Sequence, residues 1–240
     1  MSIEIGDYPK NVEKAVRQFW KSRKGATSKQ LESGKADEGN RSAVTGGKNL
    51  DGFADLLIEL VKKNGLKDAE IHSSSTTLPG YFRATKDWDL LITYQGKLIA
   101  AIELKSLCAP SVGKNLNNRV EEALGLGIDF QVAAREKAFG AGAPPFTAYL
   151  MVLEDEEQSH KVREARSPHF AADEVFQSSS YATRLEIMCE RMMREQLFDS
   201  ACVITSTQKS RGRFNDLSDA TSMKVFLGAF AACIAKASLS

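Results

Sequence analysis

The chain has 240 residues, of which 42% are hydrophobic and 26% are charged. This composition is typical of a soluble globular protein with one large core or two small ones, and it disfavours disorder and a coiled coil. Lysine and arginine number 32 against 31 acidic residues, which gives a formal net charge of +1. Taken alone, that balance argues against a nucleic-acid-binding protein, because such domains are usually basic as a whole.

The cysteines lie far apart and form no C-x-x-C pair, which argues against a zinc site and a disulfide framework. We therefore expect buried free thiols and a reducing compartment. The first ten residues lack the basic and apolar regions of a signal peptide. The longest apolar stretch, residues 225–235, is shorter than the roughly 20 residues that span a bilayer. These features predict a cytoplasmic protein with no membrane partner.

The N-terminal part of the chain divides into a helix, a polar segment and a second helix. Apolar residues at helical spacing predict a helix over 12–20. Residues 21–48 are polar and glycine-rich, and we expect a long loop or arm there, whose cations could bind a polyanion. A mobile surface loop explains this segment equally well. Residues 50–64 then predict the first core helix, which stops at Gly65.

The rest of the chain alternates strands and helices. Strands are predicted at 69–74, 88–94, 98–104, 147–153 and 201–205, a turn at 78–80, and helices at 116–137, 181–197 and 223–237. From the first core helix onward, the order is therefore helix, three strands, helix, strand. We expect one mixed α/β domain over 1–240, with an N-terminal helix and arm over 1–49, a core over 50–153, and a C-terminal helical layer with one strand over 154–240.

The charged residues with the clearest chemical meaning lie on the predicted hairpin KDWDLLITYQGKLIAAIELKS. Its second strand is apolar until Glu103 and Lys105, which share one face of the strand while Leu104 points to the other. Asp89 lies at the outer end of the partner strand. A two-residue turn would place Asp89 and Glu103 on opposite faces of the sheet. We therefore predict a three-residue loop over 94–96, or a bulge with the same effect, which makes the two carboxylates neighbours.

Two carboxylates and a lysine on one face are the groups that phosphodiester hydrolysis needs. Mg²⁺ held by one or two carboxylates and by phosphate oxygens stabilises charge on the attacking and leaving oxygens. A lysine on the same face can orient the attacking water or lower its pKa. A salt bridge at the solvated end of a strand would give the same pattern, and the residues alone leave both interpretations open.

The arrangement resembles the PD-(D/E)xK nuclease core, whose order of helix, three strands, helix and strand matches residues 50–153. Trp88 stands where the motif name has proline, but that proline is not a metal ligand. The segments YFRATKDWDLL, AAIELKS, APSVG and NNRVEEALG, together with GKADEGNRSAVTGG, resemble the XhoI-type type II restriction endonucleases more specifically. This likeness extends over most of the chain.

The resemblance implies Mg²⁺-dependent double-strand cleavage at the palindrome CTCGAG by a homodimer, paired in the cell with a DNA methyltransferase of the same specificity. By position, Asp89 and Glu103 would bind the metal ion, with the backbone carbonyl of Leu104 as a possible further ligand. Lys105 would position the attacking water. Glu59 on the first core helix is a weaker candidate for an additional acidic ligand, and an exposed helix carboxylate explains it better.

The candidate DNA contacts are cations and amides. Arginine or lysine facing guanine, and asparagine or glutamine facing adenine, would read a site rich in G·C pairs. The segment after the catalytic strand supplies both chemistries at Lys114, Asn115, Asn117, Asn118 and Arg119. Any of these asparagines could instead cap the following helix. Arg83, Lys209, Arg211 and Arg213 are candidate phosphate contacts, and Met188, Met192 and Phe226 are candidates for the dimer interface.

Two other functions fit the same residues. A repair or recombination nuclease on this core would cleave without strict sequence specificity. A non-catalytic DNA-binding protein would have lost the chemistry, although intact Asp89, Glu103 and Lys105 argue against that.

Overall fold

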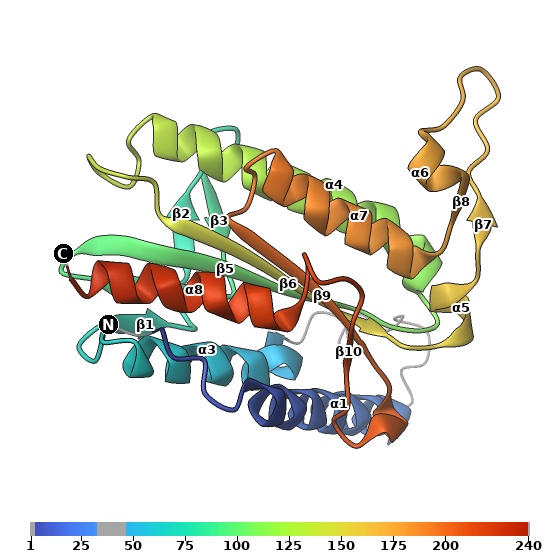
Figure 1. Ribbon diagram of the computed structural model, residues 1–240, viewed down its shortest axis with the longest axis horizontal. Coiled ribbons are helices and arrows are strands. Elements are labelled where there is room, and N and C mark those ends of the chain that lie inside the picture. Colours follow the sequence, from blue (N-terminus) through green and yellow to red (C-terminus); the bar gives the residue numbers. More distant parts are fainter. Residues whose placement is uncertain (1–2, 33–46, 240) are drawn as a thin grey trace.

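A six-stranded mixed sheet forms the centre of the molecule (Figure 1). The computed structural model describes residues 3–32 and 47–239. In spatial order the strands are β1 (Glu70–His72), β4 (Leu90–Tyr94), β5 (Lys97–Leu107), β6 (Phe146–Glu154), β9 (Ser200–Ser206) and β10 (Asn215–Asp216). Strands β5, β6 and β9 run parallel to one another, and the outer neighbours on each side pair antiparallel.

Helices cover both faces of this sheet. One face carries α1 (Tyr8–Glu32), α3 (Asp51–Lys63) and α8 (Met223–Ala237), and the other carries α4 (Val112–Arg135) and α7 (Tyr181–Arg194) (Figure 1). Each face has its own apolar core. Along β5, Ile102 and Leu104 enter the core below α3, whereas Ala101 enters the core below α4. Side chains that alternate with Leu104 therefore point toward α4.

The remaining elements are short. They are the 3₁₀ helices η1 (Gly47–Leu50) and η2 (Gln208–Ser210), the hairpin of β2 (Thr77–Pro79) and β3 (Thr85–Asp87), the pair β7 (Arg163–Glu164) and β8 (Ser178–Ser179), and the single-turn helices α5 (Glu157–His160) and α6 (Glu174–Gln177).

Helix α1 is joined to the end of strand β9 and to the loop after it. The indole nitrogen of Trp20 on α1 donates a hydrogen bond to Ser206 Oγ, at the end of β9, across 3.2 Å. Arg17, one turn earlier on α1, donates to the backbone carbonyl of Arg211 across 3.3 Å. The N-terminal helix is thus fixed to the last strands of the sheet.

The predicted order of helix, three strands, helix and strand is confirmed for the elements of the central sheet, although the short hairpin β2–β3 is inserted after its first strand. Two expectations in this region need correction. Residues 21–32 belong to α1 instead of an arm, because lysine, arginine, glutamine and glutamate favour a helix without an apolar stripe. Residues 33–46 of the expected arm lie outside the described residues. The predicted turn at 78–80 lies in the β2–β3 hairpin, whose three-residue strands are too short to produce an alternating pattern.

The C-terminal segment is not one helical layer. Its strand β9 pairs with β6 and extends the central sheet, so α7 and α8 lie on opposite faces. The expected interface residues Met188, Met192 and Phe226 are buried, because they fill these two cores. The structure therefore contradicts their proposed role in a dimer contact.

The four cysteines are free, and three of them are buried. Burial raises the pKa of the Cys108 thiol to about 12, which makes it unreactive at neutral pH. Among the residues that the structure describes, no helix is both long enough and apolar enough to cross a membrane.

Candidate active site

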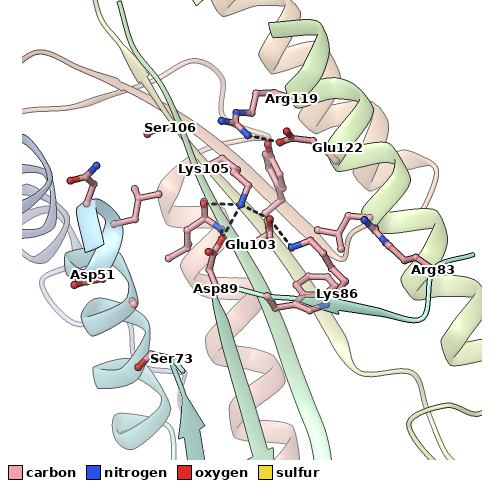
Figure 2. Close-up of a pocket in the computed structure, with 18 residues that line it drawn as sticks. Asp51, Ser73, Arg83, Lys86, Asp89, Glu103, Lys105, Ser106, Arg119 and Glu122 are labelled. Carbon is pink, nitrogen blue, oxygen red and sulfur yellow. Dashed lines mark hydrogen bonds and ion pairs between the residues drawn. The ribbon is translucent and has the colours of Figure 1, made fainter. Parts of the chain in front are cut away.

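The predicted triad lines a cavity of about 810 Å³ between α3 and α4, at one edge of the central sheet (Figure 2). The bend just before β4 contributes Asp89, and strand β5 contributes Glu103 and Lys105. Helix α3 contributes Asp51 from one side, and helix α4 contributes Arg119 and Glu122 from the other. The cavity therefore brings together groups that lie far apart in the chain.

A β-bulge brings Asp89 and Glu103 onto the same face. The turn between β4 and β5 has two residues, Gln95 and Gly96, both with positive φ, so the predicted three-residue loop is wrong. However, Thr93 pairs with Leu98 and Ile92 with Ala100, which leaves Ile99 as the extra residue of a bulge.

The bulge shifts the pairing of β4 with β5 by one residue relative to the pairing next to the turn. Beyond it, Leu91 lies opposite Ala101, and both side chains enter the core below α4. Two residues further along β5, Glu103 consequently points toward α4 as well. Asp89, in the bend just before β4, reaches the same cluster through its contact with Lys105. The bulge alternative of the sequence analysis is confirmed.

Lys105 links the two carboxylates. Its Nζ lies 3.2 Å from Asp89 Oδ2 and contacts Glu103 Oε1 (Figure 2). The same Asp89 oxygen accepts a hydrogen bond of 2.7 Å from the backbone N–H of Leu104. Lys105 also donates to the Leu104 carbonyl across 3.4 Å. The four groups thus form one continuous polar cluster.

Glu103 is the most buried member of this cluster, with 3% of its surface exposed. Burial raises its pKa above the ordinary value, although the cation of Lys105 opposes this effect. Burial lowers the pKa of Lys105, but the charges of Glu103 and Asp89 outweigh it and raise that pKa, so Lys105 is a cation at neutral pH.

One oxygen of Glu103 has an unused bonding capacity. Glu103 Oε2 is buried and has no hydrogen-bond partner among the residues that the structure describes. An unsatisfied buried carboxylate oxygen is costly unless a ligand or a cation completes its bonding. The oxygens of Glu103, Asp89 and the Leu104 carbonyl are hard donors of the kind that Mg²⁺ prefers.

The protein offers few metal ligands of its own. In the described part of the chain, no group of three or more His, Cys, Asp or Glu side chains is placed to hold a metal ion. Two carboxylates with a backbone carbonyl suit a cation that keeps several waters and completes its shell with substrate phosphates. They do not suit a closed structural site.

Two further cations reach the cavity from the segment before Asp89. Lys86 on β3 places its Nζ 3.6 Å from Glu103 Oε1. Arg83 lines the cavity and pairs through Nε with Asp129 of α4 at 2.7 Å, where Asp129 is almost fully buried. Arg83 was predicted from the sequence. Lys86 was missed because β3 was not recognised as a strand.

The predicted base-reading segment forms the first two turns of α4. Lys114, Asn117 and Asn118 are exposed, and the N-cap position is Ser111 instead of one of the asparagines. Asn115 and Arg119 line a small second pocket beside Arg23, and Arg119 also faces the main cavity. Arg119 pairs with Glu122, and its buried Nε has no hydrogen-bond partner among the described residues.

The other predicted residues lie away from the cavity. Glu59 is exposed and lines a separate depression between α1 and α3, whereas Asp51, at the first turn of the same helix, lines the cavity. The structure therefore does not bring Glu59 to the triad. Lys209, Arg211 and Arg213 lie at the carboxyl end of β9, where Arg211 lines a pocket with cations of α1: Arg17, Lys21 and Lys24.

Trp88 is part of the core beneath the site. It is 4% exposed, and its ring packs edge to face on Phe130 at a centroid distance of 5.2 Å. Trp88 thus anchors the chain just before Asp89 and the start of β4.

A mixed sheet flanked by helices, with two carboxylates and a lysine in a cavity at its edge, is the arrangement of a restriction-endonuclease-like hydrolase. The comparison with protein families agrees: the model described as restriction endonuclease XhoI matches residues 29–218. The chain belongs to the XhoI restriction endonuclease family and is a type II restriction enzyme, a site-specific deoxyribonuclease.

Three curated relatives illustrate this membership. The type II restriction enzyme BstVI of Geobacillus stearothermophilus is 48% identical over 183 residues, covering 74% of this chain and 81% of the relative. XhoI of Xanthomonas vasicola is 42% identical over 196 residues, covering 80% of this chain and 78% of the relative. AbrI of Azospirillum brasilense is 47% identical over 172 residues, covering 71% of this chain and 77% of the relative. No solved structure matches this chain.

Proposed function

We propose that this enzyme is a PD-(D/E)xK nuclease that hydrolyses both strands of DNA at the palindrome CTCGAG in a Mg²⁺-dependent reaction and leaves 5′-phosphate ends. The observation that carries the proposal is the polar cluster, in which Lys105 joins Asp89 and Glu103 at the floor of an open cavity. In a simple surface salt bridge the carboxylate would be exposed to solvent, whereas Glu103 is 3% exposed and one of its oxygens has no partner among the described residues.

In this proposal, Asp89, Glu103 and the carbonyl of Leu104 hold the metal ion. The unpaired Glu103 Oε2 supports this assignment, because it is a buried hard donor that lacks a partner among the described residues. When bound, Mg²⁺ supplies charge stabilisation at the phosphate and a coordinated water. Asp51 replaces Glu59 as the candidate for an acidic group from α3, since Asp51 is the one that lines the cavity.

Lys105 positions the attacking water and stabilises negative charge on the phosphate. As a cation with a raised pKa, it donates hydrogen bonds and does not serve as the proton acceptor. Lys86, 3.6 Å from the same carboxylate, adds a second positive charge at the phosphate position. Together the two ammonium groups compensate the carboxylates before any substrate binds.

The DNA contacts are assigned by position around the cavity. Lys114, Asn117 and Asn118 on the exposed side of α4 supply donors for bases and phosphates, and Asn115 and the largely buried Arg119 lie beside them. Arg83 contacts phosphate at the cavity. Lys209, Arg211 and Arg213 contact more distant phosphates, together with the neighbouring cations of α1.

Two copies of the chain act on one palindrome, because a twofold sequence is matched by a twofold protein and each copy supplies one triad. The specificity for CTCGAG is supported by the likeness to XhoI-type enzymes. Such an enzyme requires a DNA methyltransferase of the same specificity, and both act in the cytoplasm, where the DNA of a bacterial cell lies.

The proposal is tested with two plasmids that differ only in the presence of one CTCGAG. With Mg²⁺, the first plasmid is expected to become linear with ends that map to a single position, and the second is expected to stay intact. Asp89→Asn is expected to bind the sequence without cleaving it. Ladders or structure-dependent nicks on both plasmids would instead identify a nuclease without strict specificity, and binding without cleavage by the unaltered enzyme would identify a DNA-binding protein.

A further inference from the structure

Two exposed aromatic side chains lie beside the active-site cavity and have no part in the chemistry described above. Tyr81 and Phe82 occupy the loop between β2 and β3, and their rings pack edge to face with centroids 5.4 Å apart. They are 56% and 71% exposed. Neighbouring aromatic rings left in water indicate a binding surface, because their burial against a partner is favourable.

The loop that carries this aromatic pair is fixed by a buried carboxylate. Asp129 of α4 accepts hydrogen bonds of 2.8 Å from the backbone N–H groups of Tyr81 and Phe82, and one of 2.7 Å from Arg83 Nε. The loop follows the carboxylate so closely that a Cβ at Gly80 would lie 2.6 Å from Asp129 Oδ2. Because three donors hold the loop, its backbone is already ordered and loses little freedom on binding.

The neighbours of the pair identify the partner's chemistry. Arg83, the next residue, lines the active-site cavity, and Lys86 from the same hairpin places its Nζ 3.6 Å from Glu103. The hairpin therefore directs two cations into the cavity where the phosphate is cleaved and carries two aromatic rings immediately beside them. Nucleic acid matches this combination, since phosphates pair with cations and bases pack against aromatic rings.

We propose that the Tyr81–Phe82 pair packs against DNA bases next to the cleaved phosphate and partly unstacks a base step. This inference rests on the proposed function, because it requires DNA in the cavity. In a duplex, base faces become accessible when an apolar side chain wedges into a base step and partly unstacks it. Phe82, the more exposed ring, is the wedge, and Tyr81 supports it from the side.

The pair would also contribute to sequence selection. Pyrimidine–purine steps are unstacked more easily than other steps. A wedge at a fixed distance from the catalytic residues therefore favours DNA with a deformable step at that position. This selection works through DNA deformation and needs no hydrogen bond to a base edge.

The test uses duplexes that contain CTCGAG, with 2-aminopurine placed at successive positions in and beside the site. Ca²⁺ replaces Mg²⁺ so that the bound DNA stays uncleaved. The unaltered enzyme is expected to raise the 2-aminopurine fluorescence at one position next to the cleaved bond. Phe82→Ala is expected to abolish this rise and to weaken binding about tenfold. Phe82→Leu, which keeps an apolar wedge, is expected to retain part of the fluorescence rise and part of the binding affinity.

Phe170→Ala is the matched control, because Phe170 is 83% exposed and lies in the segment between β7 and α6. It is expected to behave like the unaltered enzyme. Unchanged fluorescence and affinity in Phe82→Ala would overturn the inference. A loss of dimers in Phe82→Ala, with the fluorescence rise intact, would also overturn it and assign the pair to a contact between copies. Cleavage of the site by the unaltered enzyme in Mg²⁺ tests the proposed function separately.

Discussion

Lys105 Nζ lies 3.2 Å from Asp89 Oδ2, and this ion pair joins residues 16 positions apart in the chain. The same ammonium group contacts Glu103, so one cation compensates two carboxylates at the floor of the cavity. Lys86, 3.6 Å from Glu103, is a second cation at this site, but Lys105 alone contacts both carboxylates in the described interactions. The cluster is therefore most sensitive to the loss of Lys105.

Replacement of Lys105 by methionine removes the cation and leaves two facing carboxylates. We expect cleavage to fall by about 10²–10³-fold, because a group that stabilises charge at the phosphate is lost. Single-turnover cleavage at saturating DNA measures this. Lys86→Met is the matched control: Lys86 is 3.6 Å from Glu103 and does not contact Asp89 in the described interactions, so its loss is expected to cost less. Equal losses in the two variants would contradict the assignment of Lys105 as the residue that positions the water.

Glu103→Gln should separate activity from stability. The amide keeps the shape of the side chain but removes a buried charge, so we expect cleavage to be abolished while the free energy of unfolding at pH 7 stays the same or rises by about 1 kcal/mol. Urea unfolding followed by circular dichroism measures the second effect. A loss of several kcal/mol would show that ion pairing with Lys105 outweighs the burial of the carboxylate.

The dependence of stability on pH follows from the same carboxylate. Burial raises the pKa of Glu103 above its ordinary value of 4.5, so the folded protein favours the protonated form. The contribution of Glu103 to folding stability is therefore fully present below pH 4.5, and it is lost as the pH rises through the pKa of Glu103 in the folded protein. Comparison of unfolding free energies of the unaltered protein and of Glu103→Gln across this range should show a difference that grows toward neutral pH.

Cleavage activity should rise with pH over the range in which the stability contribution of Glu103 falls. Metal binding needs ionised Glu103, so activity is expected to fall on acidification through a pKa above 4.5. In Lys105→Met the cation that opposes the upward shift is gone, and the acidic limb of the remaining activity should move to higher pH. If the acidic limb of the pH profile does not move in Lys105→Met, a group other than Glu103 controls it.

Substitutions at Arg119 and at Glu122 should change the affinity for DNA in opposite directions. Arg119→Ala is expected to weaken binding and to reduce the slope of log K against log salt by about 1, as for the loss of one phosphate contact. Glu122→Gln removes the partner that engages Arg119 in the free enzyme and should strengthen binding. Filter binding in Ca²⁺ at several salt concentrations measures both. Weaker binding in Glu122→Gln would assign the pair a structural role on α4.

The turn that starts β5 offers a test of the fold. Gln95 and Gly96 both have positive φ, at 50° and 73°, which is the geometry of a type I′ turn. Gln95→Asn should stabilise the protein by about 0.5 kcal/mol, and Gly96→Ala should destabilise it by about 1 kcal/mol. Thermal unfolding checks both variants. Stabilisation by Gly96→Ala would be incompatible with this turn.

The triad and the order of the core elements were predictable because they depend on local patterns. Alternation along β5 alone places Glu103 and Lys105 on one face. The bulge at Ile99 was harder to predict, since an extra residue in a strand depends on twist and packing across the sheet. Glu59 was the weaker candidate on α3, and Asp51, which lines the cavity, was missed because the sequence predicts the helix but not which of its exposed sides meets the cavity.

The bonds that join α1 to the last strands have a consequence for synthesis. Trp20 bonds to Ser206, which follows it by 186 residues, and Arg17 bonds to the carbonyl of Arg211. A ribosome delivers the chain from its N-terminus, so α1 must wait for β9 to emerge before these bonds form. The central sheet, and with it the support of the cavity, is completed only after β9 and β10 have been made. A DNA-cleaving enzyme built in this way would not be active as an unfinished chain.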